Sequence, residues 1–187
     1  MRIIPTALAE VLLIEPEVFG DERGFFMESF NERAFQAAVG RNVHFVQDNQ
    51  SRSAQGVVRG IHFQLPPGQA KLIRCARGEI FDVVVDLRRG SPTFGAWESH
   101  ELSDENLCQL YVPVGFGHGF CVLSEVADVA YRVSRYYDGS IERGFAWDDP
   151  DVGIKWPAGL DLSVSDRDAT APRLAEIADE PGFEYLS

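Results

Sequence analysis

Cationic and titratable side chains interrupt two of the most strand-like stretches of this sequence. The stretch VVRGIHFQL, residues 57–65, contains Arg59 and His62. The stretch KLIRCARGEIFDVVVDL follows shortly; it begins with Lys71 and contains Asp82. A strand that only built a hydrophobic core would not need these side chains, because burying a charge is costly unless the charge is paired. An imidazole close to cations and carboxylates is instead suited to acid–base chemistry.

Histidine spacing bears on whether this chemistry involves a metal. The chain has four histidines, which are His44, His62, His100 and His118. A metal-binding barrel of the cupin type is expected to show an H-x-H pair, but Phe63 and Gln64 follow His62, so no metal site is predicted. The sequence also lacks a G-x-S-x-G element and a glycine-rich phosphate loop. His62 is therefore predicted to be either a hydrogen-bonded structural residue or an acid–base catalyst.

Short strands that could position these side chains are predicted along most of the chain. They are rich in Val, Ile, Phe and Tyr and are separated by turns such as LPPGQ, RRGSP and VGFGHG. They are expected near residues 10–16, 24–30, 43–48, 57–64, 70–76, 79–87, 97–102, 108–114, 119–123 and 126–134. About ten regularly spaced strands with few helices predict an all-β fold, in the form of an antiparallel barrel such as a jelly roll.

Two short helices are expected outside the barrel. One covers residues 31–40, where Asn31 can cap the start and Gly40 can end the helix. Its predicted apolar face consists of Ala34, Phe35 and Ala38. The other is expected near residues 171–178.

The alternation along residues 79–87 indicates a ligand cavity inside the barrel. One face of this strand carries Phe81, Val83, Val85 and Leu87. The other face carries Ile80, Asp82, Val84 and Asp86. An acid on a face that also holds Ile and Val belongs at the mouth of a barrel or in a polar cavity, where small barrels hold a single ligand.

Composition limits the class of protein and its partners. The 187 residues predict one domain with a substantial core, and 45% apolar with 25% charged residues is ordinary for a globular protein. A net charge of −12 disfavours nucleic acid as a partner. The cysteines, Cys75, Cys108 and Cys121, are predicted to be small buried residues in a reducing compartment. No signal-peptide layout and no apolar run of about 20 residues is present, so a cytoplasmic protein without membrane contact is predicted.

Several motifs occur in a fixed order over residues 9–175. They are FGDERGFFMESFN, FVQDNQSRS, VVRGIHFQ, AKLIRCARGEIFDVVVDLR, SPTFG, VPVGFGHGF, YRVSRYY, WDDPDVGIKWP and SDRDATAP. In this order they resemble the dTDP-4-dehydrorhamnose 3,5-epimerase family, commonly called RmlC. The resemblance implies a cupin-like jelly-roll barrel without a cofactor, a homodimer that exchanges N-terminal strands, and a dTDP-linked 4-keto-6-deoxysugar as substrate.

The resemblance also implies catalytic roles. Epimerisation next to a ketone removes a carbon-bound proton from one face and returns a proton to the other, through an enolate. By matching position, His62 resembles the general base, and Asp168 resembles the acid that orients its imidazole. Lys71 is placed to stabilise the enolate, Tyr131 resembles the acid on the opposite face, and Asp82 is expected within the same cluster. From the residues alone, Tyr131 is better explained as a barrel tyrosine with a satisfied hydroxyl, and Asp168 as a helix or turn cap.

Nucleotide binding follows from the same resemblance. The positions similar to those that contact the diphosphate and sugar are Arg23, Glu28, Gln47, Asn49, Arg59, His118 and Glu142. Phe19 and Tyr137 are placed to sandwich the base. Arg167 stands where the family commonly has lysine. The resemblance implies that Arg23 and Glu28 come from the neighbouring subunit, so a monomer is expected to be inactive. From the residues alone, the sequence DERG could instead be a turn with solvated charges.

One geometric condition must hold for Arg59 and His62 to line the same pocket. In a regular strand these two side chains point to opposite faces. An irregularity such as a bulge is therefore predicted at Gly60.

Three other functions remain open at this point. The nearest is a 3-epimerase or 5-epimerase, or an epimerase for another nucleotide-linked 4-keto-deoxysugar. The second is a barrel that binds a nucleotide or sugar without catalysis. The third is a metal-dependent cupin enzyme, which the missing H-x-H pair disfavours.

Overall fold

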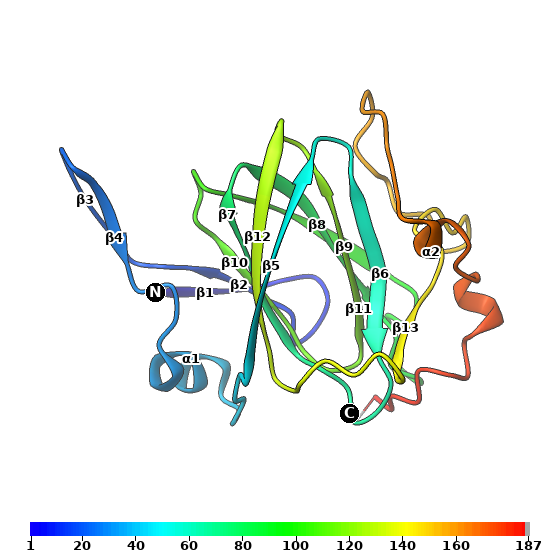
Figure 1. Cartoon of the computed structure of the whole chain (residues 1–187). Coiled ribbons are helices and arrows are strands. Elements are labelled where there is room, and N and C mark those ends of the chain that lie inside the picture. Colours follow the sequence, from blue (N-terminus) through cyan, green and yellow to red (C-terminus); the bar gives the residue numbers. More distant parts are fainter. Residues whose placement is uncertain (186–187) are drawn as a thin grey trace.

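Two antiparallel β-sheets face each other in the computed structural model, which describes residues 1–185 of the chain (Figure 1). In spatial order, the first sheet contains β1 (Arg2–Pro5), β2 (Leu12–Glu15), β10 (Gln109–Val112), β7 (Lys71–Arg77), β12 (Val126–Val133) and β5 (Gln47–Ala54). The second contains β13 (Glu142–Gly144), β6 (Val58–Gln64), β11 (Phe116–Val122), β8 (Glu79–Asp86) and β9 (Trp97–Ser103). A separate hairpin is formed by β3 (Val18–Asp21) and β4 (Gly24–Met27). This architecture confirms the predicted all-β jelly roll.

In the described part of the chain, three short helical segments lie outside the sheets, namely α1 (Glu32–Val39), α2 (Asp166–Ala169) and a 3₁₀-helix (Leu174–Glu176). The predicted caps of α1 are confirmed, because the Asn31 side chain accepts a hydrogen bond from the backbone N–H of Ala34 and Gly40 has a left-handed φ of 68°. Its predicted apolar face is wrong in part: Phe35 is buried, whereas Ala34 and Ala38 are exposed. Within residues 1–185, no helix has the length and apolarity needed to cross a membrane.

The boundaries of several elements differ from the predictions. The strand predicted over 43–48 starts only at Gln47 and continues to Ala54, so the polar stretch NQSRSA is also part of β5. This stretch is extended because every residue of β5 pairs with β12, which means that tertiary pairing overrides its weak strand propensity. The short strands β1, β3 and β13 are not predicted from the sequence. The helix predicted near 171–178 is reduced to the single 3₁₀ turn.

Buried apolar side chains fill much of the space between the sheets and also cover their outer faces. The inner cluster includes Ile73, Ile80, Val84, Leu110, Phe116, Val122 and Val129. On the outer face of the second sheet, Val83, Val85 and Leu87 pack with Leu174, Ile177 and Phe183 from the C-terminal segment. The alternation predicted along 79–87 is thereby confirmed. The three cysteines are buried and free, as predicted.

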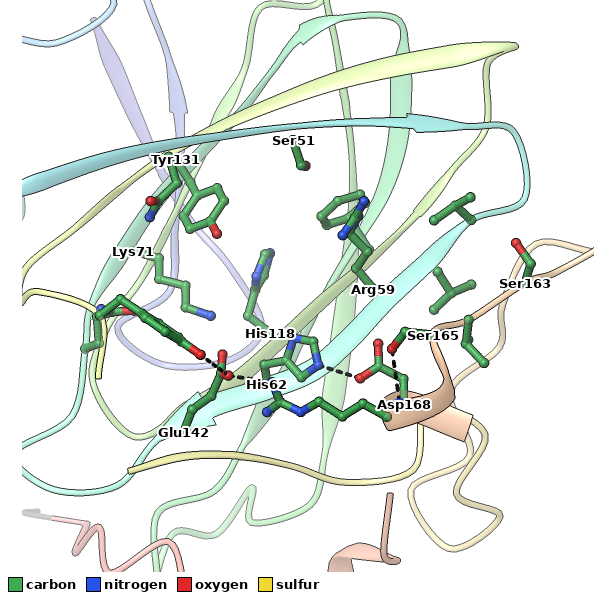
Figure 2. Close-up of a pocket in the computed structure, with 18 residues that line it drawn as sticks. Ser51, Arg59, His62, Lys71, His118, Tyr131, Glu142, Ser163, Ser165 and Asp168 are labelled. Atoms are coloured by element: carbon green, nitrogen blue, oxygen red, sulfur yellow. Dashed lines mark hydrogen bonds and ion pairs between the residues drawn. The ribbon is translucent and has the colours of Figure 1, made fainter. Parts of the chain in front are cut away.

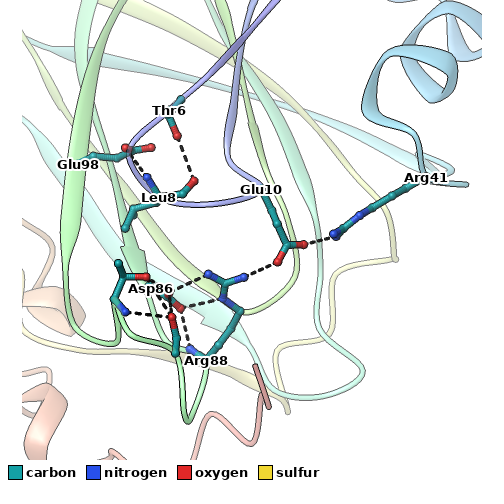
Figure 3. Close-up of polar contacts among 9 residues, drawn as sticks. Thr6, Leu8, Glu10, Arg41, Asp86, Arg88 and Glu98 are labelled. Carbon is teal, nitrogen blue, oxygen red and sulfur yellow. Dashed lines mark hydrogen bonds and ion pairs between the residues drawn. The ribbon is translucent and has the colours of Figure 1, made fainter. Parts of the chain in front are cut away.

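A network of ion pairs ties the segment between β1 and β2 to one end of the second sheet (Figure 3). The buried Arg88 donates hydrogen bonds to both carboxylate oxygens of Asp86, at 2.9 and 2.8 Å, and contacts Glu10 at 2.5 Å. Glu10 also pairs with Arg41, which follows α1. Next to this network, a carboxylate oxygen of Glu98 accepts a hydrogen bond from the backbone N–H of Leu8 at 3.0 Å. These contacts fix the path of the chain before it enters β2.

The hairpin of β3 and β4 forms an arm that projects away from the two sheets (Figure 1). All residues of β3 and most residues of β4 are exposed. Phe19, Phe25 and Phe26 are among them, and Phe26 is 68% exposed. Exposed aromatic rings grouped on one projecting element are typical of a surface that contacts another molecule.

Candidate active site

A cavity of about 510 Å³ lies between the sheets and collects most of the residues singled out from the sequence (Figure 2). The predicted residues on its wall are Asn49, Arg59, His62, Lys71, His118, Tyr131, Tyr137, Glu142, Arg167 and Asp168. They come from β5, β6, β7, β11, β12, β13, the segment after β12 and α2. Residues far apart in sequence are therefore placed around a single space.

The irregularity predicted at Gly60 is present. His62 pairs with His118 and Arg59 pairs with Phe120 in the ladder between β6 and β11, so two residues of β6 lie opposite Gly119 alone. Gly60 has a φ of +125°, and a Cβ there would lie 2.6 Å from the Gly119 Cα. Only glycine fits this close approach. Because the bulge absorbs one residue, Arg59 and His62 both reach the cavity.

His62 is oriented by a buried carboxylate. Its Nε2 lies 2.7 Å from Oδ1 of Asp168, and the Asp168 carboxylate also accepts a weaker hydrogen bond from the backbone N–H of Gly60 at 3.4 Å. Burial opposes ionisation of Asp168, but the hydrogen bond and charge of His62, together with hydrogen bonds from Gly60 and Ser165, outweigh it and lower the pKa of Asp168 below its ordinary value. With Nε2 held by this carboxylate, Nδ1 is the nitrogen that can accept a proton.

A short helix holds Asp168 in place. The hydroxyl oxygen of Ser165 accepts a hydrogen bond from the backbone N–H of Asp168 and caps α2. The helix contacts β6, and Asp168 is only 6% exposed. The cap and this packing thus fix Asp168 beside His62.

Lys71 extends into the cavity from β7, in the sheet opposite His62 (Figure 2). Burial disfavours its charged form and lowers the pKa of Lys71 to about 8, although Glu142 and Asp82 act in the opposite direction. The side chain is therefore still largely an ammonium at neutral pH. Because it is poorly solvated, its charge interacts strongly with any negative charge that develops nearby.

Tyr131 enters the cavity from β12, also in the sheet opposite His62. Burial and the nearby carboxylate of Glu142 both raise the pKa of Tyr131. The phenol consequently stays protonated at neutral pH and can donate a proton. Figure 2 shows the phenol of Tyr131 and the imidazole of His62 extending from different strands into the same cavity, which Lys71 also enters.

Asp82 contacts the cavity through His118. Nε2 of His118 lies 2.9 and 3.0 Å from the two carboxylate oxygens of Asp82, which is fully buried behind it. Burial lowers the pKa of His118, although Asp82 acts in the opposite direction. Asp82 therefore orients a residue of the wall and is not itself on the wall.

A second carboxylate cluster lies at the edge of the cavity. One oxygen of Glu142 accepts hydrogen bonds from the Tyr137 hydroxyl at 2.9 Å and from the Arg167 guanidinium at 2.5 Å. Burial alone would raise the pKa of Glu142, but these two donors outweigh it and lower the pKa. Arg167 is thereby largely committed to Glu142. Arg59 instead contacts only the hydroxyl of Ser53, at 3.0 Å, and has no acidic partner within residues 1–185.

Comparison with known proteins identifies the family. A family model described as dTDP-4-dehydrorhamnose 3,5-epimerase matches residues 5–176. The chain belongs to this family. The dTDP-4-dehydrorhamnose 3,5-epimerase of Shigella flexneri is 52% identical over 177 residues, which cover 94% of this chain and 97% of the relative. The family resemblance drawn from the ordered motifs is thus confirmed.

Two further relatives of this epimerase family bear on specificity. A crystal structure of the RmlC epimerase of Legionella pneumophila in complex with dTDP-4-keto-L-rhamnose has a TM-score of 0.96 and 46% identity, covering 100% of this chain and 99% of that chain. A dTDP-4-dehydrorhamnose 3-epimerase of Streptomyces niveus is 46% identical over 180 residues, which cover 96% of this chain and 86% of the relative. A relative described as a 3,5-epimerase and a relative described as a 3-epimerase are therefore similar to this chain to a comparable degree.

Besides Asp82, four of the residues predicted for an epimerase site do not line the cavity of their own chain. Phe19 and Glu28 line a different, more apolar cavity of about 380 Å³ at the base of the arm. Arg23 is at the tip of the arm and pairs with Asp21. Gln47 reaches the cavity only indirectly, because its amide donates to Asn49 at 2.8 Å and accepts from the backbone N–H of Tyr137 at 3.0 Å.

Several cavity residues of this epimerase-family chain are not predicted from the sequence. They are Ser51, Val57, Val58, Gln69, Phe120, Ser163, Val164 and Ser165. Ser51 could have been found: β5 alternates between inner and outer residues, so Asn49, Ser51 and Ser53 share a face. The segment from Ser163 to Ser165 has no pattern that would indicate its position.

Proposed function

We propose that the protein catalyses 3,5-epimerisation of dTDP-4-dehydro-6-deoxy-D-glucose to dTDP-4-dehydro-L-rhamnose without a cofactor, as a step of deoxysugar biosynthesis. The observation that supports this most is the placement of a base and an acid on facing sheets around one cavity. His62 comes from the second sheet and Tyr131 from the first, and Lys71 lines the same cavity. Inversion at carbon needs this arrangement, because the proton leaves one face and returns to the other.

The first step is proton removal from a carbon next to the ketone. Nδ1 of His62 takes the proton, and the electron pair of the broken C–H bond moves into a carbon–carbon double bond while the ketone oxygen becomes an enolate. Asp168 stabilises the imidazolium through its 2.7 Å contact with Nε2. Lys71 stabilises the enolate oxygen, where negative charge develops.

The second step is protonation from the opposite face. The enolate electron pair returns to carbon and takes the phenol proton of Tyr131, which regenerates the ketone with the carbon inverted. His62 then holds one extra proton and Tyr131 lacks one. Exchange with water returns both residues to their starting forms before the same sequence acts on the second carbon.

Solvent deuterium incorporation tests the proposal directly. A 3,5-epimerase working in deuterium oxide will place deuterium at carbons 3 and 5 of the hexose, which nuclear magnetic resonance can resolve. Label at carbon 3 alone would refute double epimerisation and support the 3-epimerase, the alternative that the Streptomyces niveus relative favours. His62→Ala separates catalysis from simple binding: the variant should bind dTDP normally and lose turnover.

We also propose that two chains form a dimer in which the arm of each chain completes the cavity of the other. This is supported by the position of Phe19, Arg23 and Glu28 on or beside the arm, outside the cavity of their own chain. Exposed phenylalanine rings on the arm are consistent with burial against a second copy.

Complementation tests the exchanged arm. His62→Ala and Arg23→Ala are each expected to inactivate a homodimer. In a mixed dimer, one site combines the intact His62 of one chain with the intact Arg23 of the other, so co-expression should restore activity. Mixed dimers without restored activity would refute the exchange, because each chain would then be using its own arm.

A further inference from the structure

Ser51 places a hydroxyl in the cavity for which the protein provides no partner. Its Oγ is buried and makes no hydrogen bond to any group within residues 1–185. The residue also lines the cavity that contains His62 and Tyr131. Nearly all buried polar groups in proteins are hydrogen-bonded, so an exception on the wall of a ligand cavity requires an explanation.

The neighbours of Ser51 on the same strand show how unusual this is. The inner face of β5 presents Asn49, Ser51 and Ser53 in succession. The side-chain oxygen of Asn49 accepts a hydrogen bond from Gln47 at 2.8 Å, and Ser53 Oγ accepts one from Arg59 at 3.0 Å. Ser51 lies between two polar residues whose side chains are engaged.

Its position also indicates which part of a ligand it would meet. In the ladder with β12, Ser51 pairs with Val129, and Asn49 pairs with Tyr131. Figure 2 shows Ser51 between Tyr131 and Arg59. The first is the proposed acid for the hexose, and the second carries a guanidinium suited to a diphosphate. Ser51 therefore faces the junction between these two parts of a nucleotide sugar.

We propose that Ser51 is a substrate-binding residue whose hydroxyl donates a hydrogen bond to an oxygen of the nucleotide sugar at this junction. The proposal rests on the proposed function, because it takes the ligand to be a hexose joined to a nucleoside diphosphate. Either a hexose hydroxyl or a diphosphate oxygen supplies an acceptor of the required kind. Ligand binding would give the buried hydroxyl the partner that the protein lacks.

A stability measurement separates this role from a structural one. Ser51→Ala removes a hydroxyl that makes no hydrogen bond to the protein, so the unliganded variant should unfold thermally at the same temperature as the wild type or higher. If the hydroxyl held the barrel together, the same variant would unfold at a lower temperature. Ser51→Thr keeps a hydroxyl at this position and is the conservative comparison.

Binding and turnover complete the experiment. Relative to the wild type, Ser51→Ala should raise KM for the nucleotide sugar about tenfold or more, because a hydrogen bond to the ligand is lost. The dissociation constant of dTDP, measured by calorimetry, identifies the acceptor. A matching loss of dTDP affinity indicates a diphosphate oxygen, and an unchanged dTDP affinity indicates a hexose hydroxyl. Ser51→Thr should retain most of the affinity.

Several results would overturn the assignment. Unchanged KM and dTDP affinity in Ser51→Ala would do so, as would an equal loss in Ser51→Thr, which would point to packing. A lowered unfolding temperature without ligand would indicate a structural role instead. These failures are distinct from failure of the proposed function, in which the wild-type protein itself would neither bind dTDP nor convert the sugar.

Discussion

Replacing Asp168 with asparagine tests the central contact of the proposed mechanism. Asparagine has nearly the same shape and keeps an oxygen that can accept from Nε2 of His62, but it carries no charge. The variant therefore leaves the imidazole oriented and removes the negative charge that stabilises the imidazolium. Asp166→Asn is the matched control, because Asp166 lies in the same helix, is exposed and makes no side-chain contact with His62.

The expected size of the effect follows from the geometry of the pair. The contact of 2.7 Å joins an imidazole whose side chain is 25% exposed to a carboxylate whose side chain is 7% exposed. A hydrogen bond to a charged group contributes about 1.5–3 kcal/mol, and partial exposure of His62 keeps the value below that of a fully buried pair. The loss from the transition state is therefore expected at the lower end of this range, about 1.5–2 kcal/mol, which corresponds to a decrease of roughly 10- to 30-fold in kcat/KM.

The assay measures kcat and KM with dTDP-4-dehydro-6-deoxy-D-glucose and compares them with the affinity for dTDP. Asp168→Asn should lower kcat/KM by the amount above and leave dTDP affinity unchanged, because Asp168 acts through His62. Asp166→Asn should keep the activity of the wild type. Activity within about threefold of the wild type in Asp168→Asn would refute the role assigned to the carboxylate.

Four further predictions follow from the site and from the fold. Lys71, with a pKa lowered to about 8, should give kcat/KM an alkaline limb near that pH, and Lys71→Arg should move the limb upward because guanidinium stays protonated. In the unfolded chain the Lys71 side chain has its ordinary pKa of 10.5, so between pH 8 and 10.5 the unfolded state binds more protons than the folded state. The free energy of unfolding of the wild type, relative to that of Lys71→Met, should therefore rise over this pH range when measured by denaturant unfolding. Gly60→Ala should be less stable than Gly90→Ala by about 1–3 kcal/mol in thermal unfolding. Both glycines have a positive φ, but only a Cβ at Gly60 would meet a backbone atom, at 2.6 Å. Equal losses of stability in the two variants would contradict this close approach. Arg88→Met should lower the free energy of unfolding by about 3–5 kcal/mol, because it leaves Asp86 buried without its ion-pair partner. Arg41→Met should lower it by about 1 kcal/mol or less, because the ion pair between Arg41 and Glu10 is exposed. Similar losses in the two variants would show that the network is not buried as described.

The barrel was predictable because its strands carry strong local patterns. The alternation along residues 79–87 separates an inner face from an outer face, and the structure shows the same two faces. The Gly60 bulge was also predictable, because two functional side chains at odd spacing could not otherwise share a pocket. In both cases the sequence contains the physical cause of the structure.

Other parts of the site depend on contacts that one sequence does not reveal. The polar part of β5 is a strand because β12 pairs with it, and without that pairing the sequence NQSRSA indicates a loop. Missing this part of the strand also concealed Ser51. The position of α2 depends on its packing against β6, and four residues are too few to show a helical period.

The charge distribution explains how an acidic protein can hold an anionic substrate. The chain has a net charge of −12, and several of its arginines are engaged by carboxylates, as Arg88 is by Asp86 and Arg167 by Glu142. Within residues 1–185, Arg59 and Lys71 make no ion pair, and both line the cavity. Their positive charge is therefore available to a ligand, and the acidic surface around the barrel repels anions elsewhere. A diphosphate sugar is directed to the cavity wall where the guanidinium of Arg59, which has no carboxylate partner within residues 1–185, lines the same space as the reacting groups.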